Sequence, residues 1–221
     1  MKKNCNTKLL FGTFVVCCLL FSLVLCSCVY AQSDGAKSSK ADIKTPVYRL
    51  EINTATQRVA VFYNVENAEK PIYVFPCSTG KYNNTYKGKY KTSDYYDWRI
   101  MLGNVYARYA VRFNGNELFH SVPYLRRSPD SLEYEEFNKL GKPASLGCCR
   151  MAVKDMKWIY DYTTPGTPVE VIDDASVYYP LTSKIIKIDV SDENKRGWDP
   201  TDPDPESPWN TGDDNKTGKE Q

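Results

Sequence analysis

The sequence has little of several things that particular classes of protein need. Only one of its 221 residues is histidine, so zinc sites that use two histidines, such as HExxH, are excluded. The formal net charge is +2 and no run of lysine and arginine occurs, which gives no sign of a nucleic-acid partner. Glycine and proline are too few for collagen or low-complexity sequence, while tyrosine is frequent at 17 residues. The composition predicts one globular domain with extensions.

Cysteine is scarce outside the first 28 residues, which hold five of the eight. Only Cys77, Cys148 and Cys149 remain for the rest of the chain. Three thiols cannot all pair with one another, so at least one is free or reactive, and a disulfide framework does not hold this fold.

The first 31 residues predict a segment that directs export. Leu9 to Ala31 carries no charge, follows three lysines and ends in Val29-Tyr30-Ala31, which fits the cleavage pattern of a secretory signal. The apolar run is also long enough for an uncleaved N-terminal anchor. A third interpretation is that Leu25-Cys26-Ser27-Cys28 is a lipoprotein cleavage box with Cys28 acylated. In each case we expect an extracytoplasmic protein, secreted or anchored at the bacterial cell surface, that meets the membrane only through this segment.

The remaining chain divides by composition into three parts. Residues 32–46 are polar and predict a linker. Residues 47–173 predict the folded domain, and residues 174–221 a C-terminal extension. Nine acidic residues face four basic ones from Ser191 onward. Closely spaced prolines there exclude regular structure, so we expect this tail to be extended or disordered.

Residue patterns in the domain predict mostly strands with two short helices. Asn114-Gly115 between two apolar runs is typical of a hairpin turn. The first helix is expected from Ser131 to Gly141, with Asp130 as its cap. The other expected elements are strands at 47–53, 58–63, 72–75, 107–113, 116–122 and 168–172 and a helix at 153–162.

One short segment, Ser145 to Arg150, has the residues that a thiol nucleophile needs. Gly147 permits close approach of an acyl group, and backbone N–H groups of the loop can face a developing oxyanion. Cys148 would supply the thiolate, and His120 is the one imidazole available as its base. A lone histidine is more often structural, and two adjacent cysteines are also compatible with a buried core, so the residues alone leave both interpretations open.

The sequence His120-Ser121-Val122-Pro123, followed by Ser145-x-Gly147-Cys148-x-Arg150-Met151, resembles the L,D-transpeptidase catalytic domain, the YkuD-like family. The similarity extends from about Val47 to Asp173 and includes the turn Ser78-Thr79-Gly80-Lys81. The resemblance implies a mostly β, sandwich-like fold with two short helices.

The same resemblance implies roles for individual residues. Cys148 would be the nucleophile and His120 its base. Gly147 and the Cys148 N–H would form the oxyanion site, with Ser145 shaping the loop. Arg150 and Ser121 would contact the substrate. A disulfide between Cys77 and Cys149 could protect the nucleophile, although a small buried residue is the favoured interpretation of Cys149.

Two positions depart from the family pattern. Leu146 stands where the family very often has histidine, and one base is chemically sufficient to form a thiolate. Thr85-Tyr86-Lys87-Gly88 replaces the usual Thr-Pro-x-Gly, which affects the rigidity of a turn.

The resemblance implies an enzyme of peptidoglycan synthesis that needs no metal and no organic cofactor. Its partners would be peptidoglycan stem peptides, from which it would release terminal D-Ala and form 3→3 cross-links, and family analogy implies acylation by carbapenems. An L,D-carboxypeptidase that uses water as the acceptor requires the same residues. A non-catalytic wall-binding module would explain Leu146. A sortase-like thiol hydrolase is the third alternative, and the residues around Cys148 do not match it.

Overall fold

The computed structural model describes residues 46–66 and 70–210. The chain separates into two units, Met1–Ser33 and Asp34–Gln221, and every described residue belongs to the second. The predicted export segment and all but the last residue of the predicted linker therefore lie outside the described residues. No helix in the described ranges is long and apolar enough to cross a membrane.

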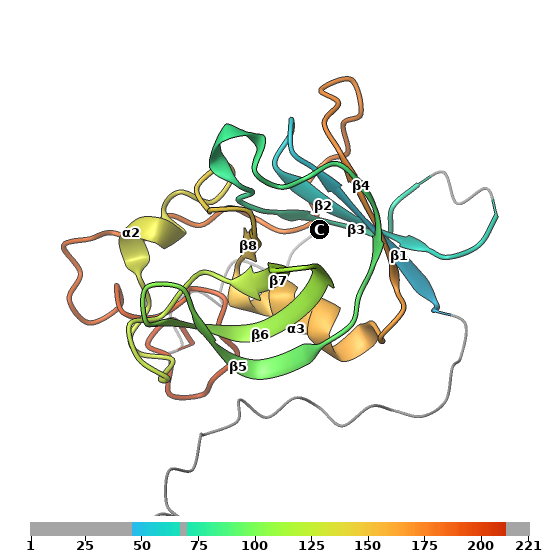
Figure 1. Ribbon diagram of the computed structural model, residues 1–221. Helices are drawn as coiled ribbons and strands as arrows, with labels where there is room; N and C mark the ends of the chain where they lie inside the picture. Colours follow the sequence, from blue (N-terminus) through green and yellow to red (C-terminus); the bar gives the residue numbers. More distant parts are fainter. Residues whose placement is uncertain (1–45, 67–69, 211–221) are drawn as a thin grey trace, which may run out of the picture. The chain divides into compact units, whose positions relative to one another are not determined.

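The described chain forms two mixed β-sheets, to which two α-helices and a 3₁₀ turn are added (Figure 1). This architecture confirms the prediction of a mostly β fold with two short helices. The five-stranded sheet has the order β3 (Tyr73–Pro76), β2 (Arg58–Tyr63), β1 (Tyr48–Asn53), β9 (Pro168–Ile172) and β4 (Gly88–Lys91). The four-stranded sheet has the order β5 (Tyr95–Met101), β6 (Val105–Asn114), β7 (Glu117–Ser121) and β8 (Cys149–Met151). The helical elements are η1 (Lys81–Asn83), α2 (Tyr134–Phe137) and α3 (Val153–Tyr162).

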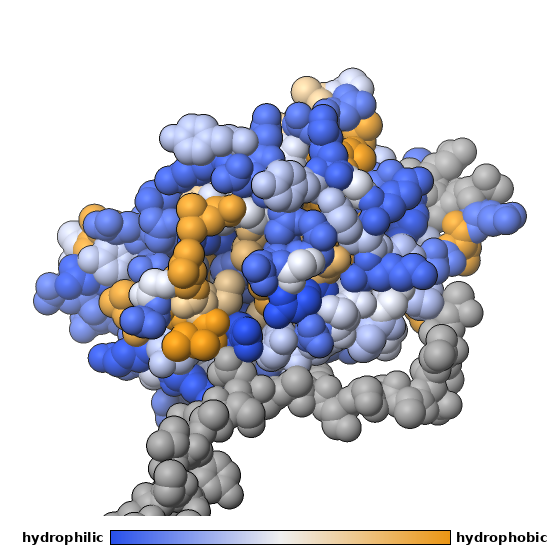
Figure 2. Space-filling view, in the orientation of Figure 1, coloured by the Kyte–Doolittle hydropathy of each residue, from blue (hydrophilic) through white to orange (hydrophobic). Residues whose placement is uncertain are grey.

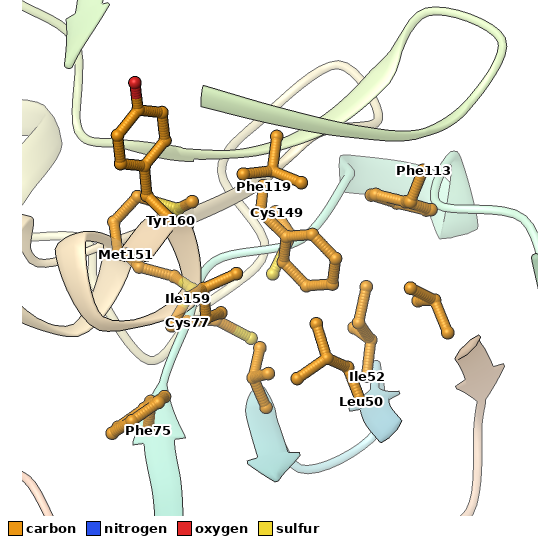
Figure 3. Close-up of a cluster of buried hydrophobic side chains, with 14 of the residues drawn as sticks. Leu50, Ile52, Phe75, Cys77, Phe113, Phe119, Cys149, Met151, Ile159 and Tyr160 are labelled. Carbon is orange, nitrogen blue, oxygen red and sulfur yellow. The ribbon is translucent and has the colours of Figure 1, made fainter. Parts of the chain in front are cut away.

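The main hydrophobic core brings together side chains from both sheets and α3. Leu50 and Ile52 alternate along β1 and are both buried, because residues two apart in a strand share one face. Met156 and Ile159 lie one helical turn apart on the buried side of α3. Figure 3 shows Leu50 and Ile52 of β1 and Ile159 of α3 in one cluster. Each fully buried aliphatic or aromatic side chain stabilises the fold by about 1.5–3 kcal/mol.

Several predicted elements match the structure and others do not. The predicted strands at 58–63 and 168–172 and the helix at 153–162 have the predicted bounds. The helix predicted from Ser131 to Gly141 was wrong, because only α2 is helical within it and Asp130 does not cap it. Strands β4, β5 and β8 were not predicted, because β4 and β8 have only four and three residues and the buried positions of β5 do not alternate.

The hairpin between β6 and β7 is present, but its turn lies one residue later than predicted. Asn114 pairs with Glu117 at the end of the ladder, so Gly115 and Asn116 are the central residues. Gly115 alone has a positive φ, +47°, at the position where a type II′ turn requires it. This shift places Asn116 and Glu117 beside the predicted nucleophile.

The C-terminal extension contains no helix or strand up to Asn210, yet it packs on the sheets. Tyr179 and Leu181 cover Phe62 on the second face of the five-stranded sheet. Thr182 exchanges hydrogen bonds with the backbone of Val74 and so occupies the free edge of β3. This contact satisfies an edge that would otherwise be open to another strand.

The acidic tail is bound as far as Asn210, which corrects the alternative of disorder, while the prediction that it lacks regular structure is confirmed up to that residue. Asp199 and Asp202 are both buried. Asp199 accepts the N–H of Val153 at the start of α3, 2.8 Å away, and Asp202 pairs with Arg108 of β6 at 3.1 Å. The aspartates that suggested disorder by composition are therefore the residues that attach this segment.

Candidate functional site

The segment Ser145–Arg150 is held by the turn that contains Ser78 and Gly80. Ser78 and Arg150 exchange two backbone hydrogen bonds of 2.8 and 2.9 Å. The hydroxyl of Thr85 accepts the N–H of Gly80 and donates to the carbonyl of Gly147. A Cβ at Gly80 would lie 2.8 Å from the Thr85 nitrogen, so only glycine fits there. The turn fixes the backbone on which Cys148 is carried.

Inside the segment, Ser145 arranges the backbone around Cys148. Its hydroxyl accepts the Gly147 N–H at 3.0 Å and donates to the Cys148 carbonyl at 2.6 Å. The Gly147 N–H, predicted as an oxyanion donor, is therefore already engaged. Among the described residues, no group accepts a hydrogen bond from the Cys148 N–H. Gly147 has a φ of +155°, and a Cβ there would lie 3.2 Å from the Asn84 carbonyl.

Strand register places Cys148 and His120 on one side of the four-stranded sheet. His120 is paired with Arg150 across the parallel strands β7 and β8, and Cys148 precedes Arg150 by two residues. Because side chains alternate along a strand, both residues point away from the main core, into which Phe119 and Cys149 point. The sheet thus brings together two residues that are 28 positions apart in the sequence.

The protonation of His120 is set by one backbone carbonyl. Nδ1 lies 2.6 Å from the Ser121 carbonyl, which can only accept, so Nδ1 carries the proton and Nε2 is left with its lone pair. Burial lowers the pKa of His120 to about 3, with the positive charge of Arg150 as the second cause. The imidazole is therefore neutral at pH 7 with the lone pair of Nε2 free, and its low pKa means that it accepts a proton only where a neighbouring negative charge, such as a thiolate, stabilises the imidazolium.

Cys148 is a partly exposed free thiol. Sγ donates to the Asn116 carbonyl at 3.7 Å, and among the described residues no hydrogen bond joins it to His120. Burial of the sulfur raises the pKa of Cys148, and the carboxylate of Glu117 adds to this rise, while the Leu118 N–H and Arg150 oppose it. The resting pair is therefore a thiol and a neutral imidazole rather than an ion pair.

Cys148 opens into a cavity of about 690 Å³ formed by the β5–β6 and β6–β7 turns, the loop after η1 and the Ser145–Arg150 segment. Leu146 and Leu102 form an apolar rim and are 73% and 84% exposed. Figure 2 shows hydrophobic surface, in orange, gathered on the left of this face. Polar side chains of both signs complete the lining: Arg99, Arg112 and Glu117. The cavity therefore offers both apolar and charged side chains to a ligand.

Glu117 was not identified from the sequence, although it belongs to this cavity. It is buried, and its carboxylate accepts hydrogen bonds from the Tyr86 N–H and the Asn114 amide. Desolvation raises its pKa above that of an exposed glutamate. Its place depends on where the hairpin turn falls, and a one-residue difference in the turn is too small for a sequence pattern to resolve.

Arg150 and Ser121 lie beside the site but do not line the cavity. Arg150 forms an ion pair of 2.6 Å with Glu136 of α2. The buried hydroxyl of Ser121 accepts the Arg108 N–H and donates to the Val122 carbonyl. Both side chains are thus committed to contacts within the fold, and their roles in binding substrate stay predictions.

Cys77 and Cys149 lie together in the main core (Figure 3). Both are free and fully buried, so no disulfide joins them. Contact with Cys77, after burial, is a cause of the raised pKa of the Cys149 thiol. In the described ranges, no group of three or more His, Cys, Asp or Glu side chains could hold a metal ion.

The family model for the L,D-transpeptidase catalytic domain, YkuD, matches residues 47–171, more than half of the chain. The chain belongs to this family. A curated relative from Bacillus subtilis (strain 168), named "Putative L,D-transpeptidase YciB", is 30% identical over 138 residues, which cover 59% of this chain and 68% of the relative.

Solved structures of the family are similar to this chain at lower identity. An L,D-transpeptidase from Mycobacterium smegmatis is 18% identical, with a TM-score of 0.46, over 57% of this chain and 58% of its own. The L,D-transpeptidase LdtMt1, solved in complex with imipenem, is 21% identical, with a TM-score of 0.47, over 57% of this chain and 59% of its own. The chain thus spans less than two thirds of these solved chains.

Proposed function

We propose that this member of the YkuD family is an L,D-transpeptidase that forms 3→3 peptidoglycan cross-links through a thioester on Cys148. The observation that carries the proposal is that Cys148 lines the cavity and lies on the same side of the sheet as a neutral, buried His120, which does not itself line the cavity. The partners are two peptidoglycan stem peptides, one as acyl donor and one as acceptor.

In the first half-reaction, Sγ turns from the Asn116 carbonyl toward the substrate, and Nε2 of His120 accepts the thiol proton. The sulfur attacks the carbonyl of the third residue of a tetrapeptide stem, at its L-centre. The Cys148 N–H is the donor available to the oxyanion. The bond to the terminal D-Ala breaks, its amine takes the proton from His120, and a thioester remains.

In the second half-reaction, the side-chain amine of another stem attacks the thioester. His120 accepts the proton of this amine and returns it to the sulfur as the Cys148 bond breaks. The products are a 3→3 amide and the free thiol. Water in place of the amine would give an L,D-carboxypeptidase, for which the same residues would serve.

The experiment that tests this proposal uses the full chain purified in detergent, with a disaccharide tetrapeptide as substrate and mass spectrometry of the products. We expect a dimer that lacks one D-Ala, and its absence with Cys148→Ser. Tripeptide alone would mean a carboxypeptidase. No conversion by the unmodified chain would reject the enzyme in favour of a wall-binding module.

The same proposal predicts that a carbapenem acylates Cys148. Support comes from the relative solved with imipenem and from the accessible thiol in this chain. Intact-mass measurement after incubation with imipenem should show one added acyl group on the unmodified chain and none on Cys148→Ser. Equal labelling of both proteins would place the reaction at another residue.

A further inference from the structure

A second hollow, of about 290 Å³, is lined by aromatic side chains and shares no residue with the cavity at Cys148. We call it the aromatic groove. Its lining consists of Tyr48, Tyr63, Ile72, Tyr73, Trp158 and Tyr162. No charged side chain belongs to this lining.

Three strands and one helix build the groove. Tyr48 and Tyr63 are a cross-strand pair of β1 and β2, with ring centroids 5.7 Å apart. Trp158 and Tyr162 lie one turn apart on α3 and stack at 5.1 Å. Tyr73 of β3 contacts the indole of Trp158 at 5.0 Å. Because regular elements carry all these rings, their positions are fixed before any ligand binds.

The groove differs from an ordinary aromatic core in its exposure. Tyr63, Tyr73 and Tyr162 are 49%, 39% and 59% exposed, whereas a core would bury such large apolar rings. Within the described residues, the phenol hydroxyls of the lining and the Trp158 N–H make no hydrogen bond. The groove therefore offers ring faces and unused polar groups side by side.

This combination specifies the chemistry of a ligand. The ligand should be uncharged where it touches the groove, with a flat apolar face to stack on rings and hydroxyl or amide groups to bond the phenols. A pyranose ring has both properties, because its C–H groups lie on its faces and its polar groups lie around its edge. A proline-rich peptide also fits aromatic grooves, but it would leave most of the phenol hydroxyls without partners.

We propose that the aromatic groove binds the glycan strand of peptidoglycan. The inference rests on the proposed function, because a stem peptide is attached to this polymer of N-acetylated sugars. Binding of the glycan at the groove and of a stem at the Cys148 cavity would be two linked events, so the first would raise the local concentration of stems for the second. The groove would thereby favour polymeric peptidoglycan over small soluble fragments.

The binding test uses the full chain in detergent and, as probes, chitotetraose and glycan strands freed of stem peptides. The test variant is Tyr63→Ala with Tyr162→Ala, and the matched control is Tyr178→Ala, which removes a tyrosine that is 61% exposed and outside the groove. Titration calorimetry should show saturable binding by the unmodified chain and the control, weakened at least about tenfold in the test variant, since two ring contacts are lost. Tyr63→Phe with Tyr162→Phe preserves the rings, so this variant should retain part of the affinity. Its melting temperature should be unchanged.

The activity test separates this proposal from the function on which it rests. Product yield from a sugar-free tetrapeptide should be unchanged in the test variant, while the yield from polymeric peptidoglycan should fall. Failure of the unmodified chain to convert the tetrapeptide would reject the transpeptidase and leave the binding result to stand alone. The glycan proposal is overturned if the unmodified chain does not bind stem-free glycan, if the test variant binds it equally well, or if a proline-rich peptide binds the groove and sugars do not.

Discussion

Two regions of this chain contain buried polar groups, and they use them in opposite ways. In the C-terminal extension, both carboxylate oxygens of Asp199 accept hydrogen bonds, from Val153 and Thr201. At the candidate site, Nδ1 of His120 is bonded but Nε2 is not, and the Cys148 N–H has no acceptor among the described residues. Buried polar groups are costly unless they are paired. The carboxylate of Asp199 is therefore used to attach the extension, whereas Nε2 of His120 and the Cys148 N–H have no partner among the described residues.

The largest expected effect comes from a substitution at the candidate site and concerns activity. His120→Gln preserves a polar side chain of similar size but has no base, so transpeptidation should fall by about 10²–10⁴-fold. The melting temperature should change little, because the side-chain amide of glutamine can donate to the Ser121 carbonyl in place of Nδ1 and no ion pair is lost. Steady-state product formation together with thermal unfolding checks both statements. A variant that unfolds in parallel with its loss of activity would assign a structural role to His120.

The next largest effect comes from a substitution in the C-terminal extension and concerns stability. Asp202→Ala leaves Arg108, whose side chain is only 18% exposed, without its partner, and should cost about 2–4 kcal/mol of unfolding free energy. The turnover of the folded protein should be unchanged. Urea unfolding measures the loss, with Glu193→Ala as the control. Glu193 forms an exposed ion pair with Arg196, so its removal should cost at most about 1 kcal/mol.

A smaller effect should appear in the dependence of stability on pH. Burial raises the pKa of Asp199 to about 6, so the folded chain binds a proton more tightly than the unfolded chain. Its contribution to stability is therefore fully present below about pH 4 and is lost as the pH rises to about 6. As the pH rises across this window, the unmodified chain should lose at most about 3 kcal/mol of unfolding free energy that the Asp199→Asn chain does not lose.

Asp155 must be considered in the same measurement, since burial also raises its pKa to about 6. The Asp199→Asn chain should therefore retain the part of the pH dependence that Asp155 contributes. A curve for the variant that is parallel to that of the unmodified chain from pH 4 to 6 would contradict the assignment to Asp199.

The smallest effect sharpens the description of the site. The negative charge of Glu117 is one cause of the raised pKa of Cys148. Glu117→Gln should therefore lower that pKa, so that iodoacetamide alkylates Cys148 a few-fold faster at pH 7. The matched control is Glu170→Gln, which lies in β9, outside the cavity lining. Equal alkylation rates in the two variants would show that Glu117 does not act on the thiol.

Much of the fold followed from local sequence patterns, and the parts that did not follow depend on distant contacts. Strand β9 and helix α3 were predicted with their bounds because alternation and a helical period are local properties. Strand β8 was not predicted, since its three residues become a strand only by pairing with β7 and Ser78. Cys148 and His120 were identified as candidates from the motif, and the structure adds that they share one side of a sheet.

Other features of the site were beyond sequence patterns for a physical reason. The proposed oxyanion donor Gly147 is bonded to Ser145, which depends on the rotamer of one hydroxyl. The bound state of Asp199 and Asp202 contradicts their acidic, proline-rich context, because their partners Val153 and Arg108 lie 46 and 94 residues away. Composition describes the average behaviour of a segment and contains no information on such single contacts.

The position of Asp199 also bears on where the domain of this chain ends. The family model matches only as far as residue 171, but the N–H of Val153 is capped by a carboxylate 46 residues downstream, and Ser207 is still fully buried. The end of the family match and the end of the packed chain are therefore different positions. A gene fragment chosen by homology would encode every residue of the motif and still leave the first turn of α3 and the guanidinium of Arg108 without the anions that complete them.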